Sequence, residues 1–566
     1  MKKIVVVGGV AGGMSAAARL RRLDESAEVI VLERGHDVSF ANCGLPYHVS
    51  GEISDRSALL LHTPDTLREA LNLDVRVRNE VIAIDTAAQT VRVRDLNAQN
   101  EYVLEYDALV LATGAEPIVP PLPGMDRPEV RTLRNVPDAD VLREMLAAGA
   151  TKAVVIGAGF IGLETVEAFR HRGLEVALVE LAPQVLPAVD IEMANLIEAE
   201  LVANEVEVHI GIGFSAVEDS ESEHPVDVVL ADGRRLPADV VLLGVGVRPS
   251  TELARAAGLK LSDRGAVIVS PSQQTSDPHI WAVGDAIQVV DAVMGSAAVV
   301  PLAGPANRQG RMAADAIMGR SVSATPVLGT AIVRVFGLTA AVTGATSRRL
   351  TAAGVEHRVI HLHPGNHAGY YPGAESIHLT VLFSPDGRLL GAQAVGGDGV
   401  DKRIDVLATA LRAGMTIDDL AELELAYAPP FGSAKDPINM AGFLGQNVLN
   451  GMLVSWGAAD IDSALSDAVL LLDVRSASEH SHGHLPNSLL IPHTQLRDRI
   501  AEVESAAAGR PIRVYCASGF RSYLAHRVLA GHGLDSATLD GGLETLRAAL
   551  PGLPMAIGVQ SKVSSH

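Results

Sequence analysis

Residues 153–180 read AVVIGAGFIGLETVEAFRHRGLEVALVE, and this stretch decides the fold. A β-rich run leads into a turn in which Gly157, Gly159 and Gly162 match Gly-x-Gly-x-x-Gly. These glycines allow a tight turn, the close approach of a pyrophosphate, and the packing of a helix on a strand. Glu180 ends the next β-rich run, where a carboxylate accepts hydrogen bonds from a ribose and repels a 2′-phosphate. The stretch predicts a dinucleotide-binding βαβ unit that prefers NADH to NADPH; a packing turn without a ligand is the alternative.

The N-terminus repeats this pattern with one departure. In GGVAGG at 8–13 the first and third glycines are present, but Val10 takes the place of the second. Glu33 ends the following strand in the ribose-binding position. Two dinucleotide sites predict a second cofactor, FAD, and we expect Asp285 to bond its ribityl chain or to cap a helix. The residues expected around FAD and NADH are Gly8, Gly13, Glu33, Arg34, Thr113, Gly114, Asp285, Gly157, Gly159, Gly162, Glu180 and Gly246.

Composition narrows the classes of protein. With 566 residues, of which 48% are hydrophobic, the chain is long enough for three or four domains. A net charge of −21 disfavours binding to nucleic acid or to an anionic membrane. No apolar run reaches the roughly 18 residues that span a bilayer, and the glycine-broken N-terminus fits a βα turn better than a signal peptide. Only two cysteines occur, so we expect a reducing, cytoplasmic location.

The order of the β-rich and helical stretches predicts an α/β fold class. We expect two Rossmann-like dinucleotide-binding domains, an α+β dimerisation domain, and a C-terminal α/β domain. Strand-like runs after residue 326 precede a helical stretch near 402–425, and a new αβ pattern starts after about 450. The predicted boundaries are 1–114 with 247–325 for the FAD-binding domain, 115–246 for the NAD-binding domain, 326–447 for the dimerisation domain and 458–557 for the last domain.

Cys43, in SFANCGLPY, follows the first βαβ strand and would lie near the isoalloxazine if the adenine end binds at Glu33. A lone cysteine is often an inert small hydrophobe. Its neighbours Asn42, Gly44 and Pro46 instead suggest a loop or helix start, where a thiolate is stabilised. No second cysteine lies close in the sequence, so Cys43 must pair with an external sulfur or pass through a sulfenate or persulfide.

These motifs, with GAGFIGLE, TSDPHIWAVGDA, HAGYYPGA and AYAPPFGSAKDPINM, resemble the single-cysteine flavin disulfide reductases over roughly residues 1–445. The most similar members are the coenzyme A-disulfide reductases and the NADH-dependent persulfide reductases. The resemblance implies a homodimer in which Cys43 forms a mixed disulfide with coenzyme A. It also implies two active-site phenols from the partner subunit, here Tyr370 and Tyr427, with Tyr371 as the alternative to Tyr370. The positions that match its coenzyme A contacts are Ser15, Arg19, Arg22, Ser39, Asn42, Asn307, Arg308 and Lys435.

The C-terminal domain has its own thiol. CASGFRS at 516–522 follows the strand-like run PIRVY, and a loop between a strand and a helix can direct backbone N–H groups at a sulfur anion. With LLDVRS and GHLPNS upstream, it resembles a rhodanese domain over about residues 458–552. The resemblance implies that Cys516 carries sulfane sulfur and that Arg521 stabilises charge on the loop. A rhodanese-like module that serves only for docking is the alternative.

Two histidine groups raise the question of a metal: His361, His363 and His367, and then His480, His482 and His484. Both fall in Gly/Pro-rich stretches that we expect to be loops, with no cysteine or fixed carboxylate spacing beside them. Alternating histidines in loops are more often solvated than bound to zinc. We predict no metal.

The sequence therefore predicts an NADH- and FAD-dependent reductase of coenzyme A persulfide or polysulfide that releases hydrosulfide. The fused sulfur-carrier domain favours a persulfide over a plain disulfide as substrate. Three alternatives remain: a coenzyme A-disulfide reductase, an NADH oxidase or peroxidase that uses a Cys43 sulfenate, and a redox-sensing flavoprotein with little turnover. The expected partners are small thiol and persulfide molecules and a second copy of the chain, not nucleic acid or a membrane.

Overall fold

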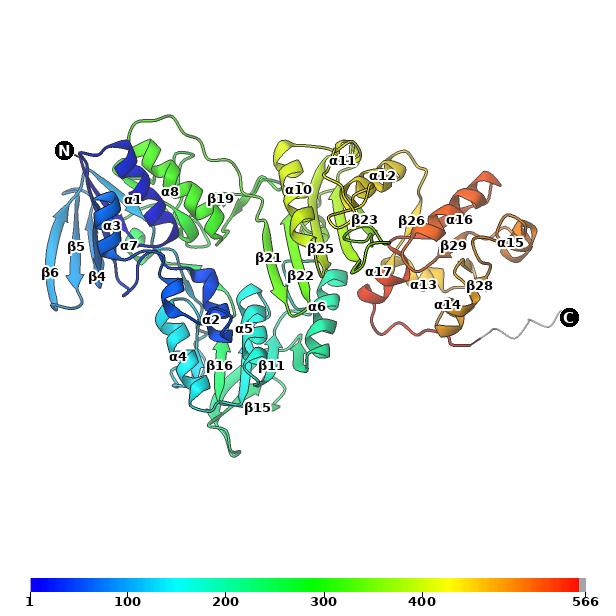
Figure 1. Cartoon of the computed structure of the whole chain (residues 1–566), viewed down its shortest axis with the longest axis horizontal. Helices are drawn as coiled ribbons and strands as arrows, with labels where there is room; N and C mark the ends of the chain where they lie inside the picture. Colours follow the sequence, from blue (N-terminus) through cyan, green and yellow to red (C-terminus); the bar gives the residue numbers. More distant parts are fainter. Residues whose placement is uncertain (1, 559–566) are drawn as a thin grey trace. The chain divides into compact units, whose positions relative to one another are not determined.

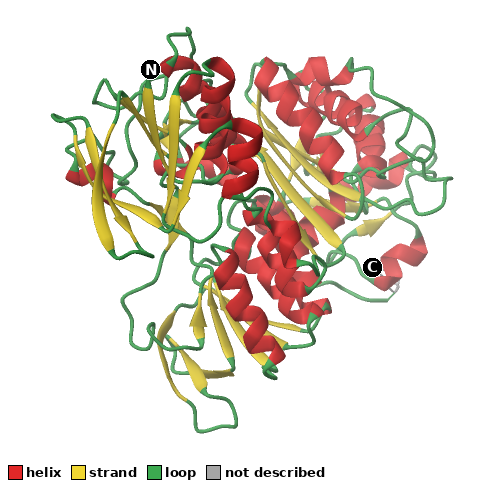
Figure 2. Ribbon diagram, turned by 60° about the vertical axis from the view of Figure 1, so that its left-hand side comes forward, coloured by secondary structure: helices red, strands yellow, loops and turns green. Residues whose placement is uncertain are grey.

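The computed structural model describes residues 2–558 (Figure 1). The chain divides into two compact units. The first comprises Met1–Pro183 and Asn204–Gly329, and the second comprises Gln184–Ala203 and Thr330–His566. Helices lie against the strands of the main sheets in both units, which confirms the predicted α/β class (Figure 2).

The first unit begins with a parallel sheet in the order β18-β7-β1-β2-β3. Ile4, Val5 and Val6 of β1 are fully buried, as the central strand of a parallel sheet must be when both of its faces are covered. Helices α1 and α8 pack on each other closely, and a three-stranded antiparallel sheet of β4, β5 and β6 completes this part. The bounds are β1 (Lys3–Val7), α1 (Ala11–Leu23), β2 (Glu28–Glu33), α2 (Leu45–Ser50), α3 (Pro64–Leu71), β3 (Asp74–Val77), β4 (Asn79–Asp85), β5 (Thr90–Asp95), β6 (Asn100–Glu105), β7 (Ala108–Leu111), α7 (Glu252–Ala256), β18 (Ile280–Ala282), β19 (Val289–Val290), β20 (Ala297–Ala298) and α8 (Ala303–Ile317).

A second parallel sheet of this unit has the order β12-β11-β10-β16-β9. Its central strand, β10, pairs with β11 and β16, and the glycine turn leads from β10 directly into α5. The bounds are β8 (Ala115–Pro117), β9 (Val130–Arg131), α4 (Val136–Ala147), β10 (Lys152–Ile156), α5 (Phe160–His171), β11 (Glu175–Glu180), β12 (Val206–Ile210), β13 (Phe214–Asp219), β14 (Val226–Leu230), β15 (Arg235–Ala238), β16 (Val240–Leu243) and β17 (Val247–Pro249).

The second unit contains an antiparallel sheet in the order β21-β22-β25-β24-β23. The helical stretch predicted near 402–425 is divided, because Gly414 adopts a left-handed φ of +72° and ends α10 before α11 begins. The bounds are α6 (Ile191–Ala203), β21 (Ala331–Val335), β22 (Leu338–Gly344), α9 (Ser347–Ala352), β23 (Arg358–Leu362), β24 (Ile377–Phe383), β25 (Leu389–Gly396), α10 (Val400–Ala413), α11 (Ile417–Ala421) and α12 (Pro437–Leu449).

Helix α6 belongs to this second unit although the chain places it between β11 and β12. Its N-terminal flank is held by Asp190, whose carboxylate accepts hydrogen bonds from Gln393 and from the backbone of Ser347. Glu200 near its other end accepts from the backbone N–H of Gly337. These bonds fix α6 to the antiparallel sheet.

The C-terminal part of the second unit is a parallel sheet in the order β26-β30-β29-β27-β28. Its core contains Trp456, Tyr515 and Leu539, all buried. Helix α17 packs beside α6 (Figure 1). The bounds are β26 (Ser455–Trp456), α13 (Ile461–Ala464), β27 (Leu470–Asp473), α14 (Ala477–His482), β28 (Leu489–Leu490), α15 (Ile500–Ala507), β29 (Ile512–Tyr515), α16 (Phe520–Gly531), β30 (Ser536–Leu539) and α17 (Gly542–Ala549).

Candidate functional site

The two glycine-rich turns leave helix N-termini open to an anion. Among the described residues no side chain caps α1 or α5, and neither helix has an acidic residue in its first turn. By contrast, Thr63 caps α3 and Asn135 caps α4. The first amides of α1 and α5 therefore point at the turns with the partial positive charge of the helix dipole, which suits a pyrophosphate.

The third glycine of each turn is required by close packing. A Cβ on Gly13 would lie 1.9 Å from the carbonyl oxygen of Gly8, and a Cβ on Gly162 would lie 1.9 Å from that of Gly157. Any side chain at either position would push the helix away from the turn. Val10 is tolerated in place of the second glycine of the first turn, where it forms the residue before α1.

Glu33 and Glu180 occupy equivalent places in the two parallel sheets. Glu33 accepts hydrogen bonds from the backbone N–H groups of Gly9 and Gly35, at 2.8 and 2.7 Å. Glu180 accepts from Ala158 and Ala182, at 2.6 and 2.7 Å. Each carboxylate is thus held at the glycine turn, and its binding to a ribose hydroxyl stays a prediction.

Cys43 is exposed and lies in a short 3-10 turn, Asn42–Gly44, directly before α2. The structure brings it near Glu164 of α5 and near Asp285. Although the residue as a whole is exposed, its sulfur is partly desolvated, and this desolvation together with the negative charges of Glu164 and Asp285 raises its pKa, while Arg134 partly opposes them. The sequence suggests that the helix start stabilises the thiolate and lowers the pKa of Cys43. The structure gives the opposite direction, because desolvation and the two carboxylates outweigh the effect of the helix start.

Glu164 and Arg134 were not among the predicted site residues. Glu164 follows the glycine turn within GAGFIGLE, a position that could have been noticed because a helix directly after such a turn lies near the bound cofactor. Arg134 belongs to no recognisable sequence motif, so no local signal points to it. Its Nε donates to the carbonyl oxygen of Ala115, and its Nη2 lies 3.9 Å from Asp285. The pKa of Asp285 is raised by burial.

The predicted coenzyme A contacts fall into two groups. In the first unit, Ser15 of α1 donates to the amide oxygen of Asn307 of α8 at 2.7 Å, and Arg308 is exposed beside it. Arg19 donates from Nε and Nη2 to Asp315, so a phosphate would compete with that carboxylate. The remaining three predicted contacts of this unit, Arg22, Ser39 and Asn42, are exposed or half-buried, while Lys435 is exposed in the second unit.

Tyr370 and Tyr427 lie together in the second unit. Their hydroxyl oxygens are 2.9 Å apart, and the shared hydrogen bond raises the pKa of Tyr370. Tyr371 instead packs edge to face on the ring of His367, with centroids 5.5 Å apart. The segments that carry the two phenols are joined by Arg403, which donates to the carbonyl oxygen of Asn366 and to Asp436. This geometry favours Tyr370 over Tyr371 as the partner of Tyr427.

Cys516 ends β29 and is fully buried. Its sulfur accepts a hydrogen bond from the backbone N–H of Gly519 at 3.2 Å and donates to the hydroxyl of Ser522 at 3.4 Å. Arg521, on the first turn of α16, is paired with Glu479. Asp473 and Arg475 are buried and bonded to each other, which gives them a structural role.

The six histidines divide equally between regular elements and the segments outside them, so the expectation that all of them lie in loops is wrong. His361 is part of β23, and His480 and His482 are part of α14. The ring nitrogens of His361 lie 2.6 Å from Asp540 and 2.9 Å from Glu192. Burial opposes the charged form of His361, but the carboxylates of Asp540 and Glu192 outweigh it and raise the pKa of His361 to about 10.

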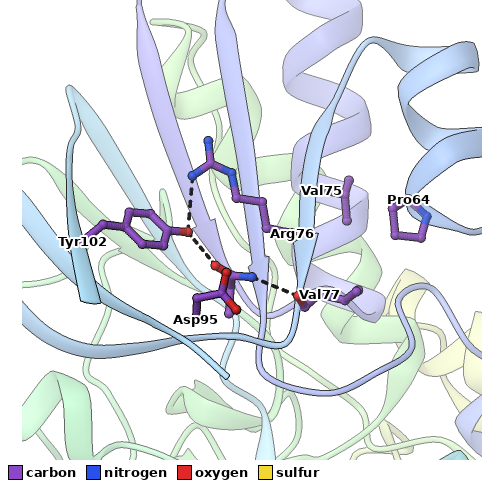
Figure 3. A pocket seen from close by; sticks show the side chains of 7 residues that line it. Pro64, Val75, Arg76, Val77, Asp95 and Tyr102 are labelled. Atoms are coloured by element: carbon purple, nitrogen blue, oxygen red, sulfur yellow. Dashed lines mark hydrogen bonds between the residues drawn. The ribbon is translucent and has the colours of Figure 1, made fainter. Parts of the chain in front are cut away.

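A shallow pocket of about 500 Å³ lies between β3 and the β4–β6 sheet, and none of the predicted site residues lines it. Its polar groups bond to one another: Arg76 donates to the hydroxyl of Tyr102, which donates to Asn79, which donates to the carbonyl oxygen of Val77 (Figure 3). We assign no ligand to it. Within residues 2–558, no helix combines the length and the apolar composition needed to cross a membrane.

Comparison with known proteins covers almost the whole chain. Residues 2–310 match the pyridine nucleotide-disulphide oxidoreductase family, residues 330–436 match its dimerisation domain, and residues 457–549 match the rhodanese-like domain. A coenzyme A disulfide reductase of Staphylococcus haemolyticus is 37% identical over 78% of this chain and 99% of its own length. An NADH oxidase of Methanocaldococcus jannaschii is 33% identical over 78% of this chain and 97% of its own length.

Two solved structures span all of these regions. The reduced CoADR-RHD of Bacillus anthracis has a TM-score of 0.94 and 43% identity, over 98% of this chain and 99% of its own. An NAD-dependent persulfide reductase from A. fulgidus has a TM-score of 0.90 and 37% identity, over 96% of this chain and 99% of its own.

Proposed function

Because this chain belongs to the pyridine nucleotide-disulphide oxidoreductases, as its sequence motifs suggest, we propose that it reduces coenzyme A persulfide or polysulfide with electrons from NADH and releases hydrosulfide. The observation that carries this proposal is the exposed thiol of Cys43 near Glu164 and Asp285. The second cysteine of the chain, Cys516, is buried in the rhodanese-like domain. Cys43 therefore takes its redox partner from solution.

The open N-termini of α1 and α5 and the two ribose-binding carboxylates fit FAD and NADH. FAD, when bound, accepts a hydride from NADH and supplies two electrons to sulfur. Glu33 would hold the ribose of FAD and Glu180 that of NADH. The carboxylate of Glu180 would repel the 2′-phosphate of NADPH.

The chemistry at Cys43 balances in three steps. The Cys43 thiolate attacks the sulfane sulfur of a persulfide, and the thiol of that molecule leaves. The thiol of coenzyme A then attacks the Cys43 sulfur, so that hydrosulfide leaves and a Cys43–coenzyme A disulfide forms. Two electrons and one proton from NADH and solvent reduce this disulfide to the Cys43 thiolate and coenzyme A thiol. The sum is one persulfide, one NADH and one proton converted to thiol, hydrogen sulfide and NAD⁺.

Tyr370 and Tyr427 would supply a proton to the leaving thiolate of coenzyme A. One phenol would donate its proton to the thiolate while the other phenol donates a hydrogen bond to the first. Cys516, with the Gly519 amide directed at its sulfur, would carry sulfane sulfur as a persulfide. The dimerisation domain supports a homodimer, and the two unpaired thiols support a reducing, cytoplasmic location.

Steady-state NADH oxidation with three acceptors tests the proposal. We expect coenzyme A persulfide to give the highest kcat/KM, with one hydrosulfide per NADH, above coenzyme A disulfide and dioxygen. A higher kcat/KM on coenzyme A disulfide would identify a coenzyme A-disulfide reductase instead, an activity that the staphylococcal relative's name also suggests. Cys43→Ser should abolish acceptor reduction but preserve flavin reduction by NADH. Cys516→Ser should preserve the reduction of small soluble persulfides.

A further inference from the structure

Two histidines and a glutamate meet where the antiparallel sheet faces the rhodanese-like domain. His363 follows β23, and His378 lies opposite it on β24, one step beyond the Leu362–Leu379 pair. Glu544 reaches this point from α17. One ligand atom from each of the three residues lies within 4.8 Å of the other two. In the sequence 15 residues separate the two histidines and Glu544 belongs to another domain, so no spacing revealed the group.

The protonation of His363 follows from its hydrogen bonds. Its Nε2 lies 3.0 Å from the carbonyl oxygen of Gly541, which can only accept, so Nε2 carries the proton. The lone pair is therefore on Nδ1, which faces His378 Nδ1 at 2.8 Å and Glu544 at 3.8 Å. Histidines that bind metals generally donate their second N–H to a carbonyl or carboxylate in this way.

The distances suit a small transition-metal ion. Zn–N bonds of about 2.1 Å at a tetrahedral angle place two ligand atoms about 3.4 Å apart. The 2.8 and 3.8 Å separations bracket this value, so side-chain shifts of about half an ångström complete the site. The rings of His363 and His378 meet at an interplanar angle of 69°, which lets both nitrogens converge without stacking.

We propose that His363, His378 and Glu544 bind one Zn²⁺ ion. Two imidazole nitrogens and one carboxylate form a donor set that zinc uses in proteins, and imidazole ligands disfavour Mg²⁺ and Ca²⁺. The Glu544 side chain is 40% exposed, which leaves an entry path and room for a water as the fourth ligand. When the ion binds, the proton on His378 Nδ1 leaves to solvent or to Nε2 of the same ring.

The ion would add a metal-mediated link between two domains that already touch, through the His361–Asp540 hydrogen bond and the packing of α17 on α6. His363 and His378 belong to the antiparallel sheet, and Glu544 lies one helical turn after the Gly541–Gly542 loop of the rhodanese-like domain. That loop packs on the Cys516 loop, because Leu543 donates its backbone N–H to the carbonyl oxygen of Cys516. Zinc would therefore fix the sulfur-carrying loop relative to the sheet.

Zinc titration of the full-length flavoprotein tests the proposal, in a Cys43→Ser, Cys516→Ser background that removes thiolate ligands. Using ZnCl₂ and isothermal titration calorimetry, we expect one tight site per chain. His378→Ala and Glu544→Gln should each weaken the binding more than roughly 10-fold, since changes in outer-shell partners alone cost that much. His171→Ala, which alters a second group of candidate ligands formed with Glu52 and Glu167, is the matched control and should leave this site unchanged.

The proposal is overturned if the background protein binds no zinc stoichiometrically, or if His378→Ala binds it equally well. Flavin absorbance and near-ultraviolet circular dichroism identify a variant that fails to fold. If a variant fails to fold, the ligands are identified instead from the zinc X-ray absorption spectrum of the background protein. Two imidazole ligands and one carboxylate support the site, and a spectrum without paired imidazoles contradicts it.

Discussion

Arg521 donates two hydrogen bonds to the carboxylate of Glu479, at 2.8 Å from Nη1 and 2.6 Å from Nη2. This pair joins the helix that follows the Cys516 loop to the N-terminus of α14. The guanidinium is the main reason that the pKa of Glu479 falls from 4.5 to about 2. The cation predicted to stabilise charge on the loop is thus held in place by a carboxylate that the sequence did not indicate.

We expect the stability that Glu479 contributes to depend on pH. Its pKa is depressed in the folded chain, so this contribution is complete above pH 4.5 and is lost as the pH falls toward 2. The difference in unfolding free energy between the wild type and Glu479→Gln should be about 1 kcal/mol near neutral pH and should narrow below about pH 5. Urea unfolding followed by Trp456 fluorescence, in a Trp281→Phe background, measures it. Glu504→Gln is the control, and a difference that stays constant on acidification would contradict the assignment.

The reactivity of Cys43 should respond to Glu164. Because this carboxylate, after burial, helps to raise the pKa of the thiol, Glu164→Gln should shift the pH profile of iodoacetamide alkylation of the reduced apoprotein to lower pH. Arg134→Met should shift the profile upward, since Arg134 acts in the opposite direction. Peptide mass spectrometry assigns the alkylated residue. Equal shifts in the same direction for both variants would show that the changes are structural.

Cofactor preference should depend on Glu180. Glu180→Ala removes the acceptor for a ribose hydroxyl and the charge that repels a 2′-phosphate. We expect kcat/KM for NADH to fall roughly 10-fold and kcat/KM for NADPH to rise, from steady-state rates with the same acceptor. Glu175→Gln at the exposed start of the same strand should leave both values unchanged. An unaltered ratio in Glu180→Ala would place the ribose elsewhere.

Substitution of the two adjacent tyrosines, Tyr370 and Tyr371, should have different effects on kcat for acceptor reduction. Tyr370→Phe breaks the phenol pair with Tyr427 and should lower kcat for acceptor reduction roughly 10- to 100-fold, while flavin reduction by NADH is unchanged. Tyr371→Phe keeps the ring that packs on His367 and should behave as the wild type. Stopped-flow measurement of each half-reaction tests this. The reverse ranking would mean that Tyr371 faces the substrate.

The parts of the fold that the sequence predicted depend on local patterns. Gly157–Gly162 and Glu180 lie within a single βαβ unit, so residues close to them in the sequence determine their geometry. Contacts between distant segments left no such pattern. Arg134 reaches Asp285 through tertiary packing, and helix α6 joins the antiparallel sheet through Asp190 and Gln393, which are 203 residues apart.

The same limit applies to the site. The sequence singles out Cys43 as a candidate because the chain has only two cysteines and this one stands in a segment typical of a loop or helix start. The direction of its pKa shift was not predictable, because burial and the charges of Glu164 and Asp285 come from the folded surroundings. No sequence pattern links His363, His378 and Glu544 for the same reason, since strand pairing and domain contact bring them together.

The central claim is that the Cys43 thiol pairs with an external sulfur, and intact-protein mass spectrometry tests it most directly. The purified protein should carry one coenzyme A adduct per chain that a thiol reductant removes, and peptide mapping should place it on Cys43. A Cys516→Ser variant should keep the adduct, and Cys43→Ser should lose it. A mass unchanged by reduction in protein exposed to coenzyme A disulfide, or an adduct that maps to Cys516, would contradict the account.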